Sequence, residues 1–230
     1  MDRARGNLYN GAVDARSLLR LLPRFLVTPV SLGLAAALVS LGPLLDLFSS
    51  PAFRESSSQD TDLFFQWAFL DSAVFSTWAL VRTGQAGWWT RRLGHGTRWG
   101  TELALLVAGS LLPSLLVAGV QARLAALPLA ELGSSWLGWL FGLTLTQASL
   151  ALVLLRIDLP AFARPLLLLA LTWWLPALLG AGGWLALTAL SIPEGGGLST
   201  GTTPPPVEIA SILALLGAAW LLGHRTHPLP

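Results

Sequence analysis

Long apolar runs separated by short polar segments dominate the pattern of hydrophobic and polar positions along the chain. A transmembrane helix needs about 20 mainly apolar residues, and six runs reach or approach that length. The pattern therefore predicts an all-α, polytopic membrane protein with six transmembrane helices, at Phe25–Phe48, Leu63–Val81, Leu103–Val120, Ser134–Leu155, Ala161–Leu179 and Val207–Gly223.

The segment before the first run is basic and has a helical period. Arginines recur every four residues, at Arg16, Arg20 and Arg24, and leucines between them fall on the opposite face. This pattern predicts an amphipathic helix over Asp14–Arg24 that lies among the lipid headgroups, with its arginines on phosphate. The alternative is a plain basic flank of the first transmembrane helix.

A second irregular feature lies between the fifth and sixth runs. The glycine cluster Gly180–Gly183 is followed by Trp184–Ile192, which is too short to cross a bilayer and too apolar for an open loop. This segment is predicted to be re-entrant, dipping into the outer leaflet. The alternative is one long fifth helix that bends at the glycines.

Composition and charge fix the class and the orientation. Hydrophobic residues make up 53% of the chain and charged residues only 11%, and all 14 basic residues are arginine. Twelve of them fall in one set of connections, whereas Arg54 and Arg123 fall in the other set. Because cytoplasmic loops are enriched in Arg and Lys, both termini are expected in the cytoplasm of a bacterial cell, with the protein in its inner membrane. The domains are then a cytoplasmic N-terminus (1–24), a transmembrane domain (25–223) and a cytoplasmic tail (224–230); the net charge of +2 reflects this sidedness and predicts no nucleic-acid partner.

One acidic residue, Asp71, lies near the middle of the second predicted span. An acid at that depth costs about 2.5–3.5 kcal/mol on insertion scales, so it should face protein or water rather than lipid. Gln147 and Thr172 on other spans are candidates to line a substrate pathway with it. Its hydrogen-bond partners are expected among these two and the neighbouring hydroxyls Ser72, Ser76 and Thr77. A buried packing contact without a pathway is the alternative interpretation.

The fourth run carries a small residue at every fourth position, including Gly138 and Gly142. Stripes of small residues let helices approach closely in lipid. These glycines are therefore expected to pack against another helix, either within the chain or in a second copy.

Missing residue types exclude several kinds of chemistry. The chain has no cysteine, and its histidines, His95, His224 and His227, all fall in predicted cytoplasmic segments, so no metal site or cofactor is expected within the membrane. No Gly-x-Ser-x-Gly sequence is present, which argues against a serine hydrolase. Without lysine there is no Walker A motif, so the chain is not expected to be an enzyme and any ATP hydrolysis would come from a partner.

The predicted layout resembles the permease subunits of type-2 ATP-binding-cassette (ABC) exporters. In that family an amphipathic helix precedes six spans, a cytoplasmic connection after the second span contacts the ATPase, and a re-entrant pair lies between the last two spans. The connection here is Thr83–Gly100. The sequence Arg98-Trp99-Gly100-Thr101-Glu102 partly matches a Glu-Arg-x-x-Gly-Thr motif of these permeases, but the preceding Glu is absent and no room remains for the usual connecting helix.

The resemblance implies an exporter that forms its pathway as a dimer with a second permease copy or a paralogue and is driven by a separate ATPase subunit. Arginine and tryptophan are favoured at interfaces, so the candidates for docking the ATPase are Arg91, Arg92, Arg98, Trp88 and Trp89. A loop that rests on anionic headgroups is the competing interpretation. A membrane scaffold or trafficking protein of the Yip-like kind is the alternative function, and a lipid-modifying enzyme is a more distant one.

Overall fold

The structure is a computed structural model, and it describes residues 22–48, 57–86, 90, 95–124, 135–174 and 205–225. Several predictions lie outside these residues. They concern the amphipathic helix up to residue 21, the re-entrant segment Trp184–Ile192, Gly180–Gly183, and the docking candidates Trp88, Trp89, Arg91 and Arg92.

The described part of the chain is all-helical and contains no strand. Each apolar run of the sequence corresponds to a helix, so the prediction of an all-α fold is confirmed for these residues. The elements are α2 (Pro29–Phe48), α3 (Ser57–Gln85), α5 (His95–Leu124), α7 (Ser135–Arg156), α8 (Ala163–Leu169) with the π-helical turn η2 (Ala170–Trp174), and α11 (Pro205–Arg225).

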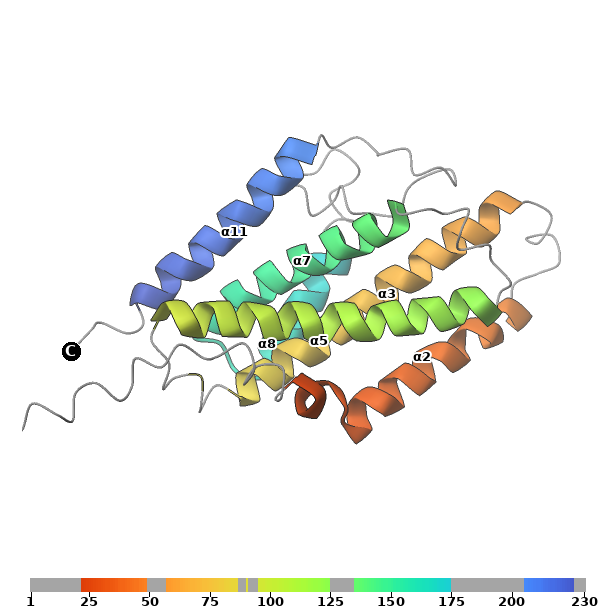
Figure 1. The fold of residues 1–230 in the computed structure, drawn as a ribbon, viewed down its shortest axis with the longest axis horizontal. Coiled ribbons are helices and arrows are strands. Elements are labelled where there is room, and N and C mark those ends of the chain that lie inside the picture. Colours follow the sequence, from red (N-terminus) through yellow and green to blue (C-terminus); the bar gives the residue numbers. More distant parts are fainter. Residues whose placement is uncertain are drawn as a thin grey trace, which may run out of the picture.

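The helices lie side by side and alternate in direction, with α3 at the centre (Figure 1). α3 packs against α2, α5, α7 and α8, while α11 packs against α7 and α5. The end of α3, the start of α5 and the ends of α7 and α11 lie at one end of the bundle, on the left in Figure 1, and the start of α2 faces the same way at the lower centre. That end carries most of the arginines of the described chain, whereas Arg123 lies near the last residue of α5 at the opposite end.

One described helix is long and apolar enough to cross a membrane by itself, α5 over Gly96–Leu124. Four other helices contribute shorter apolar stretches of 10–17 residues, at Pro29–Leu41, Leu140–Arg156, Ala163–Thr172 and Ile212–Gly223. The helical nature of the runs is thus established, and six membrane crossings stay a prediction.

The first span does not begin where the apolar run begins. Phe25 belongs to a short helical turn over residues 22–26, and α2 starts at Pro29. The break is stabilised by reciprocal hydrogen bonds: the Thr28 amide donates to Ser31 Oγ (2.9 Å) and the Ser31 amide donates to Thr28 Oγ1 (3.1 Å). Thr28 is therefore an N-cap, and a proline in the first helical position fits because its missing N–H is not needed there. Hydropathy could not detect this boundary, because the residues on both sides of it are apolar.

The connection between α3 and α5 is shorter than the predicted Thr83–Gly100. α3 continues to Gln85 and α5 begins at His95, so the two ends of the predicted loop are helical. That prediction placed the loop limits where apolarity ends, and a helix can extend several residues beyond its apolar part into polar sequence. Arg98 consequently lies in the first turns of α5 rather than in a loop.

The apolar core lies between α3, α5 and α7, and one glycine sets its tightest approach. A Cβ atom built on Gly109 would lie 2.9 Å from Phe25 Cε1 and 3.0 Å from Ala79 Cβ. The Phe25 ring meets Trp78 edge to face at 5.6 Å between centroids, and the Arg82 guanidinium lies 5.8 Å from the same ring. Gly109 thus allows the turn at residues 22–26 to dock where α3 and α5 cross.

Candidate functional site

Polar side chains are buried inside the bundle, whereas large apolar side chains are exposed on its surface. Two groups of these buried polar side chains are linked by hydrogen bonds between side chains, and we call them the end cluster and the central cluster. The end cluster contains Thr90, Arg98, Glu102 and Arg156, and the central cluster contains Asp71, Ser72, Ser76, Gln121 and Gln147. The exposed apolar side chains include a stripe along α5 at Leu112, Leu116, Val120 and Leu124.

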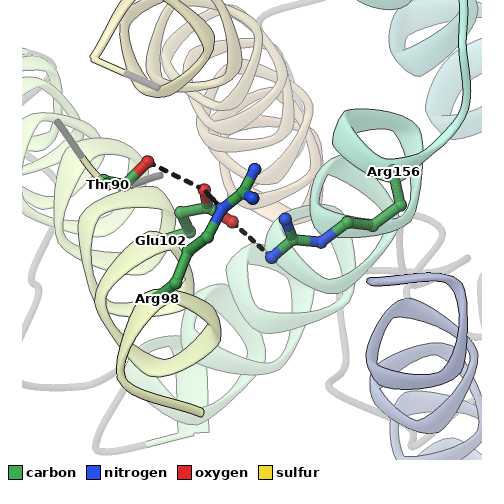
Figure 2. A network of polar contacts seen from close by, with 4 residues as sticks. All are labelled: Thr90, Arg98, Glu102 and Arg156. Atoms are coloured by element: carbon green, nitrogen blue, oxygen red, sulfur yellow. Dashed lines mark hydrogen bonds and ion pairs between the residues drawn. The ribbon is translucent and has the colours of Figure 1, made fainter. Parts of the chain in front are cut away.

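The end cluster is built around the carboxylate of Glu102, which is 2% exposed (Figure 2). Its Oε1 accepts hydrogen bonds from Arg98 Nε at 2.9 Å and from Thr90 Oγ1 at 3.1 Å. Its Oε2 accepts from Nη2 of Arg156, the last residue of α7. One carboxylate therefore joins α5, α7 and residue 90 of the α3–α5 connection.

The end cluster holds two guanidinium groups for one carboxylate. Both point toward Glu102 in Figure 2. Burial lowers the pKa of Arg156, which lies just beyond the predicted fourth span; Glu102 raises that pKa and Arg98 lowers it. The Nε atom of Arg156 is buried without a hydrogen-bond partner. The cluster therefore carries one more positive charge than its own carboxylate can compensate.

The central cluster contains Asp71, whose side chain is fully buried. This burial agrees with the prediction that the acid faces protein or water rather than lipid, and its role in a pathway stays a prediction. Its Oδ1 lies 3.5 Å from Gln121 Nε2 on α5, and the same amide donates to the carbonyl oxygen of Leu38 on α2 at 3.3 Å. Asp71 Oδ2 and Gln121 Oε1 are both buried without a partner.

Gln147 forms the second half of the central cluster. Its Oε1 accepts hydrogen bonds from Ser72 Oγ and Ser76 Oγ, each at 2.7 Å, which joins α7 to α3. Its Nε2 is buried and has no partner. The central cluster thus keeps a donor and two acceptors unused inside the bundle.

The partners expected for Asp71 from the sequence are wrong. Gln147 binds the two serines instead, Thr77 Oγ1 donates to the Ala73 carbonyl (2.8 Å), and Thr172 Oγ1 donates to the Leu168 carbonyl (2.8 Å). Thr172 is buried in the π-helical turn η2 and has no described bond to the central cluster. Asp71 pairs with Gln121 because α5, rather than α7 or η2, faces that side of α3.

The first of the two predicted packing glycines of α7, Gly138, does not contact another helix within the described part of the chain. Gly138 is exposed, and a Cβ atom built there would meet nothing within 4 Å. Gly142 is half-buried, and its carbonyl accepts a hydrogen bond from Thr146 Oγ1 (2.9 Å). Close packing inside the chain uses Gly109 instead, and packing of Gly138 against a second copy stays a prediction.

The docking candidate Arg98 is engaged inside the protein. It pairs with Glu102 four residues along α5, and its side chain is 14% exposed. The i, i+4 spacing of these two residues was readable in the sequence. The pairing of Glu102 with Arg156 and that of Asp71 with Gln121 were not readable, because each depends on which helices become neighbours.

The two clusters are suited to different chemistry. Among the described residues, no group of three or more His, Asp or Glu side chains could hold a metal ion. The end cluster can bind anions through its guanidinium groups, and the central cluster can hydrogen-bond water or a polar solute. No family model, no curated protein and no solved structure matches the chain.

Proposed function

We propose that the bundle lies in a lipid bilayer with its long axis across the membrane. The support is the distribution of polarity: large apolar side chains are exposed along α2, α5, α8 and α11, while hydroxyl, amide and charged groups are buried between the helices. Polar groups in a membrane protein face the bundle interior and satisfy one another there. Lipid would cover the apolar exterior that water would leave exposed.

The arginine-rich end of the bundle is proposed to face the cytoplasm. Among the described residues it carries Arg24, Arg82, Arg98, Arg156, Arg164 and Arg225. Arg123 lies at the other end. Enrichment of Arg on the cytoplasmic side is the usual rule for membrane proteins. In this orientation the end cluster lies at the cytoplasmic interface and the central cluster lies within the membrane.

Within that frame, the chain is proposed to be the permease subunit of an ABC exporter. The resemblance in layout to type-2 permeases motivates this assignment. The energy would come from a separate ATPase, because the sequence has no lysine for a P-loop. The ATPase would dock on the cytoplasmic connection between α3 and α5, which carries Arg91 and Arg92.

The observation that carries the transport proposal is the central cluster. Asp71, Gln121 and Gln147 are buried, and each has a polar atom without a partner. Buried polar atoms are normally hydrogen-bonded, so unused ones need water or a bound solute. We propose that they line the substrate pathway, and that Thr172 in the π-helical turn η2 does so as well; such π-helical turns are frequent at functional sites.

Co-purification tests the proposal. The tagged chain is expressed in its own host, solubilised in mild detergent and isolated with its bound proteins. An ATP-binding subunit with a Walker A motif is expected in the complex. The double variant Arg91→Glu/Arg92→Glu should release it while the permease still inserts into the membrane fraction, because the substitutions reverse charges of the proposed docking connection and leave the sequence of the described helices unchanged.

The matched control is Arg123→Glu, which reverses one exposed charge at the opposite end of the bundle. It should leave the ATPase bound. If no ATPase accompanies even the unmutated chain, the exporter proposal fails, and capture of trafficking or scaffold proteins instead would favour the Yip-like alternative.

A further inference from the structure

We infer that the end cluster is a binding site for a phosphate group, supplied either by the headgroup of an anionic lipid or by a free phosphate ion. The inference rests on the proposed membrane placement of the bundle, although not on its partnership with an ATPase. It concerns Arg98 and Arg156, which the transport pathway does not use.

The first argument is charge balance. Arg98 and Arg156 share the single carboxylate of Glu102, so the buried cluster keeps a net charge of about +1. The nearest acid along the chain, Asp158, is exposed, and no ion pair joins it to an arginine of the described residues. A buried charge without a counter-charge is costly, so an external anion stabilises this arrangement.

The second argument is the free hydrogen-bonding capacity. The Arg156 side chain is 3% exposed, and its Nε–H is buried without an acceptor. The Arg98 side chain is more open, at 14%. In Figure 2 both guanidinium groups lie beside Glu102, and the carboxylate takes only part of their donors. An anion therefore finds a deep guanidinium and a more accessible one at the same place.

The third argument concerns the neighbourhood of the cluster. Arg164 follows the turn after α7, and its Nη2 donates to the carbonyl of Ile157, the residue after Arg156 (3.3 Å). Its own Nε is buried without a partner. A third guanidinium thus raises the positive potential at this end of the bundle, where no described acid other than Glu102 is paired with an arginine.

Phosphate is the anion that this chemistry fits. Guanidinium groups offer a planar fork of donors that matches phosphate oxygens, and two arginines can bridge one phosphate. Basic sites between helices at the cytoplasmic level of a membrane bind lipid headgroups in this way. The proposed placement of the arginine-rich end puts the cluster at that level.

The experiment uses the full chain, purified in detergent and depleted of lipid. Its melting temperature is recorded with added phosphatidylglycerol, with phosphatidylcholine and with inorganic phosphate. Phosphatidylglycerol should raise the melting temperature more than phosphatidylcholine, whose choline compensates its phosphate. An equal rise with inorganic phosphate identifies the free ion as the source, and a rise with the anionic lipid alone identifies the headgroup.

Arginine variants assign the effect to the cluster. Arg98→Gln should raise the concentration of phosphatidylglycerol needed for half-saturation by roughly tenfold, because one charge-assisted hydrogen bond is lost. Arg123→Gln, at the opposite end of the bundle, should leave it unchanged. Arg98 is chosen because it is the more exposed of the two arginines, so its variant is expected to fold.

Glu102→Gln separates binding from a merely structural role. The substitution removes the competing negative charge, so phosphatidylglycerol should bind more tightly relative to that variant's own lipid-free state. A purely structural cluster would instead lose its stability without any gain in lipid response. An unchanged lipid response in Arg98→Gln, or a weaker one in Glu102→Gln, overturns the inference.

Failure of this inference differs from failure of the proposed function. A chain that fractionates with membranes but does not discriminate between the phosphate-bearing probes refutes the phosphate site alone. A chain that stays out of the membrane fraction refutes the membrane placement and, with it, the lipid headgroup as a source.

Discussion

The end cluster and the central cluster both involve α5 and α7, but they are built from different chemical groups. At the end of the bundle, one carboxylate accepts three hydrogen bonds, two of them from charged groups, and Arg156 Nε stays without a partner. In the centre, one acid, two amides and two serines form only weaker or uncharged contacts, and three polar atoms stay buried without partners. The first cluster concentrates positive charge, and the second contains mainly uncharged amides and hydroxyls.

The difference follows from depth if the bundle spans a membrane. Near the interface, headgroups and water reduce the cost of bringing ions together, so ion pairs can hold helix ends. In the middle of a bilayer, polar groups are expensive and are found where they serve a pathway or a packing contact. The contrast indicates that the end cluster concentrates positive charge where an anion can meet it, and that the central cluster keeps donors and acceptors where a polar solute can meet them.

The largest expected effect is on the end cluster. Glu102→Leu leaves two arginines at a buried site, and breaking a buried ion pair from one side typically costs about 3–5 kcal/mol. The double variant Glu102→Leu/Arg156→Leu should recover much of that loss because it removes a stranded charge as well. The melting temperatures of Glu102→Leu, Arg156→Leu and the double variant are measured in detergent. If the destabilisation of the double variant equals the sum of the two single destabilisations, Glu102 and Arg156 are not coupled.

A smaller effect is expected on α5 between the two clusters. Gly109→Ala places a methyl group 2.9 Å from Phe25 Cε1 and 3.0 Å from Ala79 Cβ, and overpacking of this kind costs about 1–3 kcal/mol. Gly119→Ala is the matched control on the same helix, because its added Cβ meets nothing within 4 Å. The control should be neutral or slightly stabilising, as alanine favours helix over glycine. Equal melting temperatures for the two variants would show that Gly109 does not set the helix approach.

The helices themselves were predictable from the sequence, because long apolar runs are a strong signal. Their ends were not. α3 and α5 continue beyond their apolar parts into residues such as Gln85 and His95, and α2 begins at Pro29 within an apolar stretch. Hydropathy marks which part of a helix avoids water, whereas capping and tertiary contacts decide where the helix stops.

The candidate site was predictable only in part. Asp71 was recognisable as an isolated acid in an apolar run, and its burial confirms that reasoning. Its partner Gln121 is 50 residues away, and Arg156 is 54 residues from Glu102. Such pairs depend on the order in which helices pack, which a single sequence does not specify. Of the two ion pairs of the end cluster, only Arg98–Glu102 could have been predicted from the sequence, because its residues are four positions apart on one helix.

The smallest expected effect is in the central cluster, where Asp71→Asn is compared with Asp71→Leu. Asn retains an oxygen that can accept from Gln121 Nε2, so its stability should stay within about 1 kcal/mol of the wild type. Leu removes the acceptor and leaves the Gln121 amide with the Leu38 carbonyl alone, so melting temperature, membrane expression and any transport activity should fall further.

The double variant Asp71→Leu/Gln121→Leu decides what that loss means. If Asp71 acts only through a packing contact with Gln121, the double variant should recover part of the lost stability, with a coupling of about 0.6 kcal/mol as measured for hydrogen bonds between membrane helices, and any transport activity should recover with it. If Asp71 lines a pathway, the double variant should show the same recovery of stability and still fail to transport. Equal stability, expression and transport in all four proteins would mean that the acid is incidental, and the contrast between the two clusters would then reduce to the ion pairs at the end of the bundle.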